Sequence, residues 1–275
     1  PEVNARLLIG DAGLTSNPKL NNLEKGVVSA RGDWLAMVDA NLMLAPDFLC
    51  GVADSWRPDT GLVSGPPLGI RAESFWGAVE CAFLNTSQAR WQLAADALGM
   101  GFAQGKTLFW SRRVLDAGGG VTALGRDMAE DVASTKLVRG QGFKVHLPQW
   151  LSAQPVGART MQAVWDRQLR WSRVRRDGFP ALFLAEIAQG PVPGLVVLLS
   201  LGVVDAVPVW LAAAFLAFWY GAEIVFGRTL RLAFSPRDFV AMIVRDLLQP
   251  ALWVATFARR GFDWRGTEMT AVATR

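Results

Sequence analysis

The run of residues 207–226 constrains this chain more than any other segment. It is nearly uncharged, Glu223 being its single charge, and its length of about 20 residues suffices to span a bilayer. The chain as a whole is 51% hydrophobic with a mean hydropathy of +0.23, too apolar for an ordinary soluble domain and too polar for a pure bundle of spans. A mixed protein is therefore predicted, with one globular and one membrane part.

The membrane part is expected at residues 181–275, with two to three transmembrane or re-entrant helices. Residues 193–204 are apolar, and so are residues 239–257, although Arg245 and Asp246 interrupt the latter. That segment is open to three interpretations: a re-entrant segment, an interfacial segment, or a span whose ion pair faces the protein.

Charge and cysteine content narrow the class of protein. The formal net charge of +4 and the pI of about 9.5 suit anionic headgroups or a phosphate-bearing substrate. Nucleic acid is disfavoured as a partner, because the basic residues lie beside membrane-like sequence. Neither Cys50 nor Cys81 belongs to a CxxC pair, which argues against a zinc site or a disulfide framework. Basic clusters flank the apolar segments and favour a cytosolic globular domain: Arg173, Arg175 and Arg176 before them, Arg259 and Arg260 after them.

The globular part, residues 1–180, has the pattern of an α/β fold. Short apolar segments alternate with helical ones, which predicts a largely parallel sheet covered by helices. The continuous apolar run before Asp39 suggests a strand with both faces covered. The expected strands are 5–9, 35–39, 62–64, 107–110 and 143–147, and the expected helices are 47–55, 73–91 and 128–139.

The first candidate site residue is Asp39, at the tip of a predicted strand and two positions before Asn41. Ligands of open α/β sheets collect at the carboxyl ends of strands. A carboxylate there can hold a hard divalent cation that bridges to substrate phosphates. The alternative is that Asp39 caps a turn through its side chain.

Two further stretches carry charged residues in suggestive positions. Glu130 and Asp131 begin a predicted helix, where a carboxylate either stabilises the helix N-terminus or acts as a general base. Arg167, Arg170 and Trp171 fall at i, i+3 and i+4 on one helical face. Two guanidiniums there could grip a pyrophosphate, or the helix could lie against anionic lipid.

Together and in this order, the stretches resemble the ceramide glucosyltransferases of glycosyltransferase family twenty-one, which are inverting, membrane-bound enzymes with a GT-A fold. MVDAN supplies the second of the family's aspartates as Asp39, AEDVA supplies the third as Asp131, and RQLRW supplies the Arg-Trp motif. The segment NPKLNNL, residues 17–23, matches a loop of the family, and GLVSGPP, residues 61–67, resembles the segment after its metal strand.

The resemblance implies a mixed, mostly parallel GT-A sheet in residues 1–180, the C-terminal part of the catalytic domain, followed by transmembrane or interfacial helices. It implies transfer of glucose from UDP-glucose to the primary hydroxyl of ceramide, with inversion, by a multi-pass protein whose catalytic domain faces the cytoplasm. The implied roles are Mg²⁺ or Mn²⁺ binding by Asp39 with support from Asn41, base catalysis by Asp131 with its pKa raised by Glu130, pyrophosphate binding by Arg167 and Arg170, an apolar wall at Trp171, and a donor pocket lined by Lys19, Asn21 and Asn22.

Several positions depart from the family pattern. The chain begins at Pro1, so the family's first aspartate and N-terminal span are expected in a longer protein. Asn41 replaces the second acid of the usual D-x-D, and Gln88 stands near where animal relatives carry a histidine. The one histidine, His146, is expected to be structural.

Two alternatives stay open. The Ala-rich and Arg-rich composition suggests a bacterial inner-membrane protein, so a hopanoid-lipid transferase using UDP-N-acetylglucosamine fits the same motifs. A non-catalytic protein of the membrane, one that binds lipid or scaffolds partners, is the alternative from another class.

Overall fold

The computed structural model describes residues 5–10, 13–15, 17–264 and 267–269. Its centre is a mixed four-stranded sheet in the order β1-β4-β2-β5. Strand β4 is antiparallel to both β1 and β2, and β2 is parallel to β5. Three strands thus share one direction, which confirms a mixed sheet with parallel elements, although β4 makes two of the three strand pairings antiparallel. The strands are β1 (Trp34–Val38), β2 (Thr60–Val63), β4 (Thr107–Ser111) and β5 (Lys144–His146).

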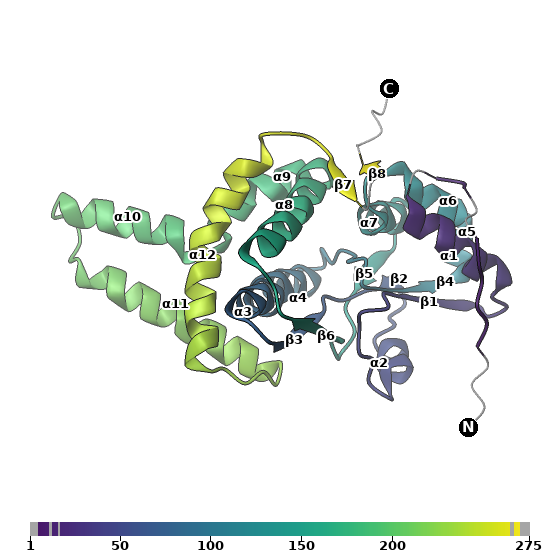
Figure 1. Ribbon diagram of the computed structural model, residues 1–275, viewed down its shortest axis with the longest axis horizontal. Coiled ribbons are helices and arrows are strands. Elements are labelled where there is room, and N and C mark those ends of the chain that lie inside the picture. The colour runs from purple at the N-terminus through teal and green to yellow at the C-terminus, as the bar shows by residue number, and fades with distance from the viewer. Residues whose placement is uncertain (1–4, 11–12, 16, 265–266, 270–275) are drawn as a thin grey trace.

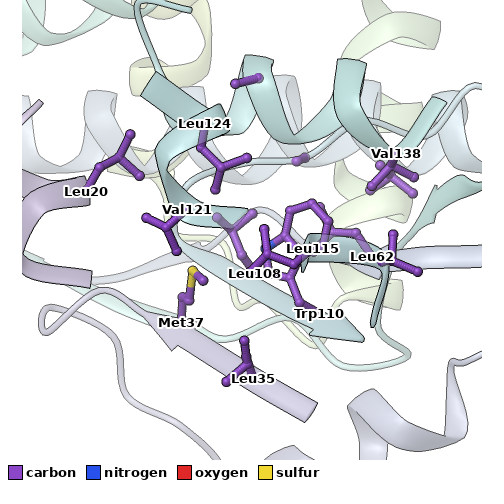
Figure 2. Close-up of a cluster of buried hydrophobic side chains, with 14 residues drawn as sticks. Leu20, Leu35, Met37, Leu62, Leu108, Trp110, Leu115, Val121, Leu124 and Val138 are labelled. Atoms are coloured by element: carbon purple, nitrogen blue, oxygen red, sulfur yellow. The ribbon is translucent and has the colours of Figure 1, made fainter. Parts of the chain in front are cut away.

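Helices on one face of this sheet enclose the main core (Figures 1 and 2). Trp110, Leu62 and Leu115 have no exposed surface there. On the opposite face α2 (Phe48–Asp54) buries Val52 in a smaller cluster. The helices of the main layer are α1 (Pro18–Ser29), α5 (Arg112–Ala117), α6 (Gly120–Ala123) with the 3₁₀ turn η2 (Leu124–Arg126), and α7 (Glu130–Gly140).

Two strand predictions are corrected. Residues 5–9 form no strand, because no described strand pairs with them, and Leu7 and Ile9 are each 86% exposed. Strand β1 is not covered on both faces. It lies at the end of the strand order, and it alternates between buried Leu35 and Met37 and exposed Trp34 and Ala36.

A second layer joins the sheet to the C-terminal helices. Strands β3 (Leu68–Ala72) and β6 (Ala153–Gly157), which the sequence pattern did not predict, pair in parallel. The predicted helix 73–91 begins later and runs further. It comprises α3 (Phe75–Ala82), the π-helical segment η1 (Phe83–Gln88) and α4 (Ala89–Ala97). The side chain of Asn85 in η1 bonds both backbone groups of Gly69 in β3, at 2.7 and 2.9 Å, and so fixes helix to strand.

From Met161 onward the described chain is helical, apart from the antiparallel pair of β7 (Phe262–Trp264) and β8 (Thr267–Met269). In Figure 1, α10 and α11 lie together and project away from the body, and their surface carries exposed apolar side chains such as Val197, Trp210 and Phe218. The helices are α8 (Met161–Gly178), α9 (Pro180–Ala185) with the 3₁₀ turn η3 (Glu186–Gln189), α10 (Pro191–Val203), α11 (Trp210–Thr229) and α12 (Pro236–Thr256).

Within the described ranges, α11 and α12 are each long and apolar enough to cross a membrane. The pair formed by residues 180–189 and α10, bent by 57°, adds a third if it counts as one span. Arg245 and Asp246 of α12 are buried, and the Arg245 guanidinium lies 2.8 Å from Glu223 of α11. Of the three interpretations of this segment, the structure supports a helix whose ion pair faces the protein.

Candidate active site

The register of β1 against β4 creates the acidic end of the site. Val38, the last residue of β1, pairs with Thr107, the first residue of the antiparallel strand β4. Asp39, which follows β1, therefore lies opposite Lys106, which precedes β4. The Asp39 N–H accordingly donates to the carbonyl of Lys106 at 3.0 Å. The Lys106 ammonium then reaches Asp39 Oδ2 at 2.9 Å and Asn41 Oδ1 at 3.1 Å. The sequence motifs did not identify Lys106, because only strand pairing places it here.

A second lysine links this pair of strands to α7. Asn17 caps α1, and Pro18 opens it, which brings Lys19 into its first turn. The Lys19 ammonium lies 2.8 Å from Asp39 Oδ1 and 2.6 Å from Glu130 Oε1, and it donates to the Gly105 carbonyl at 2.7 Å. One ammonium thus connects the two acidic motifs, which are far apart in the sequence.

These contacts set the charges at this end. Burial disfavours ionisation of Asp39, but Lys19 and then Lys106 outweigh it and hold the pKa of Asp39 below its usual value. Burial likewise opposes the charge on Lys19, yet Glu130 and Asp39 raise the pKa of Lys19 above its usual value. For Lys106, burial is the larger effect and lowers the pKa despite Asp39. The carboxylate of Asp39 is therefore ionised at neutral pH.

Asp131 lies in the first turn of α7, beside Gly105. Its Oδ2 accepts from the Gly105 N–H at 3.2 Å, and its Oδ1 accepts from the Val132 N–H at 2.8 Å. Burial, followed by repulsion from Glu130, raises the pKa of Asp131 to about 6, although the two N–H groups act in the opposite direction. A carboxylate with such a pKa can accept a proton near neutral pH.

Helix α8 presents its motif to the same space. Arg167 donates to Glu80 Oε1 at 2.9 Å, and its guanidinium lies over the Trp171 ring, 5.0 Å from the centroid. Gln168 donates to the other oxygen of Glu80 at 3.2 Å. Among the described residues no carboxylate pairs with Arg170, whose pKa is lowered by burial and then by Arg167. Glu80, fully buried in α3, positions the arginine motif, and no motif in the sequence indicated it.

Side chains around Asp39, at the start of α7 and on α8 line one cavity of about 1330 Å³. Its remaining wall is largely apolar and comes from η1, α4, α9 and α12: Phe83, Trp91, Leu182, Phe183, Leu252 and Trp253. Of the residues predicted for the site, the cavity is lined by Lys19, Asn22, Asp39, Asn41, Glu130, Asp131, Arg167, Arg170 and Trp171.

Asn21 is the exception among the predicted donor-pocket residues, because it does not line this cavity. Its side chain is buried and bonds the backbone N–H and carbonyl of Thr15, at 2.8 and 2.9 Å, so that it holds the loop before α1. His146 also lies away from the cavity. It is buried in β5 with Asp96 at 2.7 Å and Asp59 at 3.1 Å from its ring nitrogens. Cys50 and Cys81 are free thiols.

The family model described as "Glycosyl transferase family 21" matches residues 1–274. The chain therefore belongs to this family of glycosyltransferases. Two curated relatives from Caenorhabditis elegans are similar over nearly the whole chain. Ceramide glucosyltransferase 3 is 24% identical over 96% of this chain, and ceramide glucosyltransferase 1 is 23% identical over 98%. The chain spans only 60% and 59% of their lengths.

Among solved structures, a mannosyltransferase from Pyrobaculum calidifontis in complex with GDP-Man and Mn²⁺ is similar at 15% identity, with a TM-score of 0.36. The match covers 82% of this chain and 65% of that one. The match to the family model, and not this structural similarity, shows the family of the chain.

The residues around Asp39 do not fit the predicted Mg²⁺ or Mn²⁺ site in the arrangement found. Divalent cations of this kind are held by carboxylate oxygens together with substrate phosphates. Here both Asp39 oxygens and the Asn41 oxygen already accept from lysine ammonium groups, which a cation would have to displace. Within the described ranges, no cluster of three His, Cys, Asp or Glu side chains is placed to hold a metal.

Proposed function

We propose that the protein transfers glucose from UDP-glucose to the primary hydroxyl of ceramide, with inversion, on the cytoplasmic face of a bacterial inner membrane. One observation carries the proposal. A single cavity combines a carboxylate of raised pKa, a group of cationic side chains and an apolar wall built from the membrane-side helices. A nucleotide sugar needs the cations, and a lipid acceptor needs the wall.

The donor diphosphate would lie against α8. Arg167 and Arg170 are one turn apart on the helix face that lines the cavity, and guanidiniums bind phosphate oxygens through paired hydrogen bonds. Glu80 keeps the Arg167 guanidinium in place, and Trp171 closes the site with an apolar ring. Asn22 and Lys19 line the wall on the side of α1.

The chemical step is a single displacement. The acceptor hydroxyl oxygen forms a bond to the anomeric carbon of the sugar while the bond from that carbon to the diphosphate oxygen breaks, and UDP leaves with the electron pair. Asp131 takes the hydroxyl proton on its carboxylate. Gly105 and Val132 orient this carboxylate through their N–H groups, so that it is positioned before the acceptor binds.

The acceptor would enter from the bilayer. Leu182, Phe183, Leu252 and Trp253 come from α9 and α12, so an acyl chain can contact them while its hydroxyl group reaches Asp131. The names of the two curated relatives favour ceramide as the acceptor and glucose as the sugar. A hopanoid polyol with UDP-N-acetylglucosamine fits the same chemistry and is the second candidate.

The test uses the full-length protein in detergent. It is incubated with ceramide or a hopanoid polyol, each with UDP-glucose, UDP-galactose and UDP-N-acetylglucosamine, and mass spectrometry detects the lipid plus one sugar. Glucosylceramide as the main product supports the proposal. Product only from the hopanoid keeps the mechanism and replaces the substrates. No product from any pair, together with no UDP binding, would favour a non-catalytic lipid-binding or scaffold protein.

The rate of transfer is expected to fall at acid pH with a midpoint near pH 6. Asp131 must be ionised to accept the proton, and its pKa of about 6 means that protonation removes the base below that pH. A pH profile of kcat/KM checks this. Glu130→Gln removes the neighbouring negative charge, so its midpoint should move to lower pH. A midpoint that stays in place in this variant would contradict the contribution assigned to Glu130.

A further inference from the structure

Lys106 occupies a distinctive position in the cavity. Its ammonium lies between Asp39 Oδ2 and Asn41 Oδ1, at 2.9 and 3.1 Å, and its side chain is only 10% exposed. Strand pairing fixes the position of Lys106, because the Asp39 N–H donates to the Lys106 carbonyl directly beside the paired strands β1 and β4. Lys106 is therefore anchored by its backbone beside the two oxygens that its ammonium bridges.

The charges at this position balance without a further ion. Asp39 carries one negative charge, and the neutral amide of Asn41 adds an oxygen without a second charge. One ammonium is enough to neutralise this pair. Lys19, which bridges Asp39 and Glu130, balances the second carboxylate in the same way. A divalent cation added here would stand beside two ammonium groups, at an electrostatic cost.

A bound diphosphate would meet the lysine and arginine donors of the cavity. Four cationic side chains line the same cavity. They are Lys19 on α1, Lys106 directly before β4, and Arg167 and Arg170 on α8. An ammonium carries three donors. Lys106 uses two of them on Asp39 and Asn41 and has a third for a phosphate oxygen.

We propose that Lys106 supplies the cation for the donor diphosphate, so that this protein binds the nucleoside diphosphate without a divalent metal ion. The inference rests on the proposed function, since it concerns the same donor. Lys106 stabilises the negative charge that grows on the leaving diphosphate, with Arg167 and Arg170 on the other side. Asp39 and Asn41 act as positioning residues that hold the Lys106 ammonium.

The experiment measures UDP binding to the full-length protein by calorimetry, once in EDTA and once in Mg²⁺ or Mn²⁺. The Kd of the wild-type protein is expected to differ less than about threefold between these conditions. Lys106→Met should weaken binding in EDTA by about tenfold to a hundredfold, the range for a lost charge-assisted hydrogen bond. Lys106→Arg keeps the charge and should retain most of the affinity.

Controls separate folding and general charge effects from the proposed role. Lys136→Met removes a lysine outside the cavity lining, and its Kd should equal that of the wild type. Thermal unfolding of each variant shows whether it is folded, and Lys106→Arg provides the comparison if Lys106→Met is unstable.

Three results would overturn the inference in different ways. UDP binding that is lost in EDTA and restored by Mg²⁺ or Mn²⁺ would refute it while leaving the proposed function in place. No UDP binding in any condition would remove the proposed function and the inference together. An unchanged Kd for folded Lys106→Met would also refute the role of this lysine.

Discussion

The Asp131→Asn variant of the full-length protein is expected to lose sugar transfer while it still binds UDP-glucose. An amide keeps the size of the carboxyl group but cannot accept the proton of the acceptor hydroxyl, and general-base catalysis contributes about a hundredfold to ten-thousandfold in rate. The cationic residues proposed to bind the diphosphate are untouched. The measurements are kcat by mass spectrometry and the Kd of UDP-glucose by calorimetry.

Asp116→Asn is the matched control for this experiment. Asp116 is an exposed carboxylate in α5 and does not line the cavity, so the same chemical change there should leave kcat unaltered. If Asp131→Asn turns over at a near-normal rate, Asp131 is not the base. If it loses donor binding and transfer alike, its main role is to maintain the site.

The second large effect is expected at the buried charges between α11, α12 and η1. The guanidinium of Arg245 contacts Glu223 at 2.8 Å, Asp246 at 2.9 Å and the Thr86 hydroxyl at 2.6 Å, and it has no exposed surface. Arg245→Ala leaves these carboxylates buried without this counter-ion. Loss of one partner from such a pair costs about 3–5 kcal/mol. Because Arg90 still pairs with Glu223, the lower end of that range is expected.

Thermal unfolding in detergent measures this loss as a Tm lowered by roughly 6–12 °C. Arg228→Ala is the control, since Arg228 is exposed on α11, and its Tm should change little. In the Arg245→Leu background, a further Asp246→Asn change should recover part of the stability, because Asp246 then carries no uncompensated buried charge while Glu223 keeps its pair with Arg90. A Tm for Arg245→Ala within about 1 °C of the wild type would show that this cluster does not join α12 to the catalytic part.

The sequence alone predicted the features that depend on local pattern. Apolar length predicted the α11 span, and alternating apolar segments predicted the mixed α/β sheet with strands at β1, β2, β4 and β5. The motifs around Asp39, Asp131 and Arg167 predicted a common site, and the fold brings them to one cavity. Periodicity could not tell which strand lies at the sheet edge, so the expectation that both faces of β1 are covered was wrong.

Sequence by itself thus determined the family, the long apolar helix α11 and nine of the residues that line the cavity, because these are encoded in short stretches of neighbouring residues. Only the tertiary structure decided the partners of those residues. Lys106 meets Asp39 through antiparallel register, Glu80 meets Arg167 through helix packing, and Asn21 turns into the loop before α1 instead of the cavity. Such contacts join residues distant in the chain, and their geometry exists only once the strands and helices have packed together.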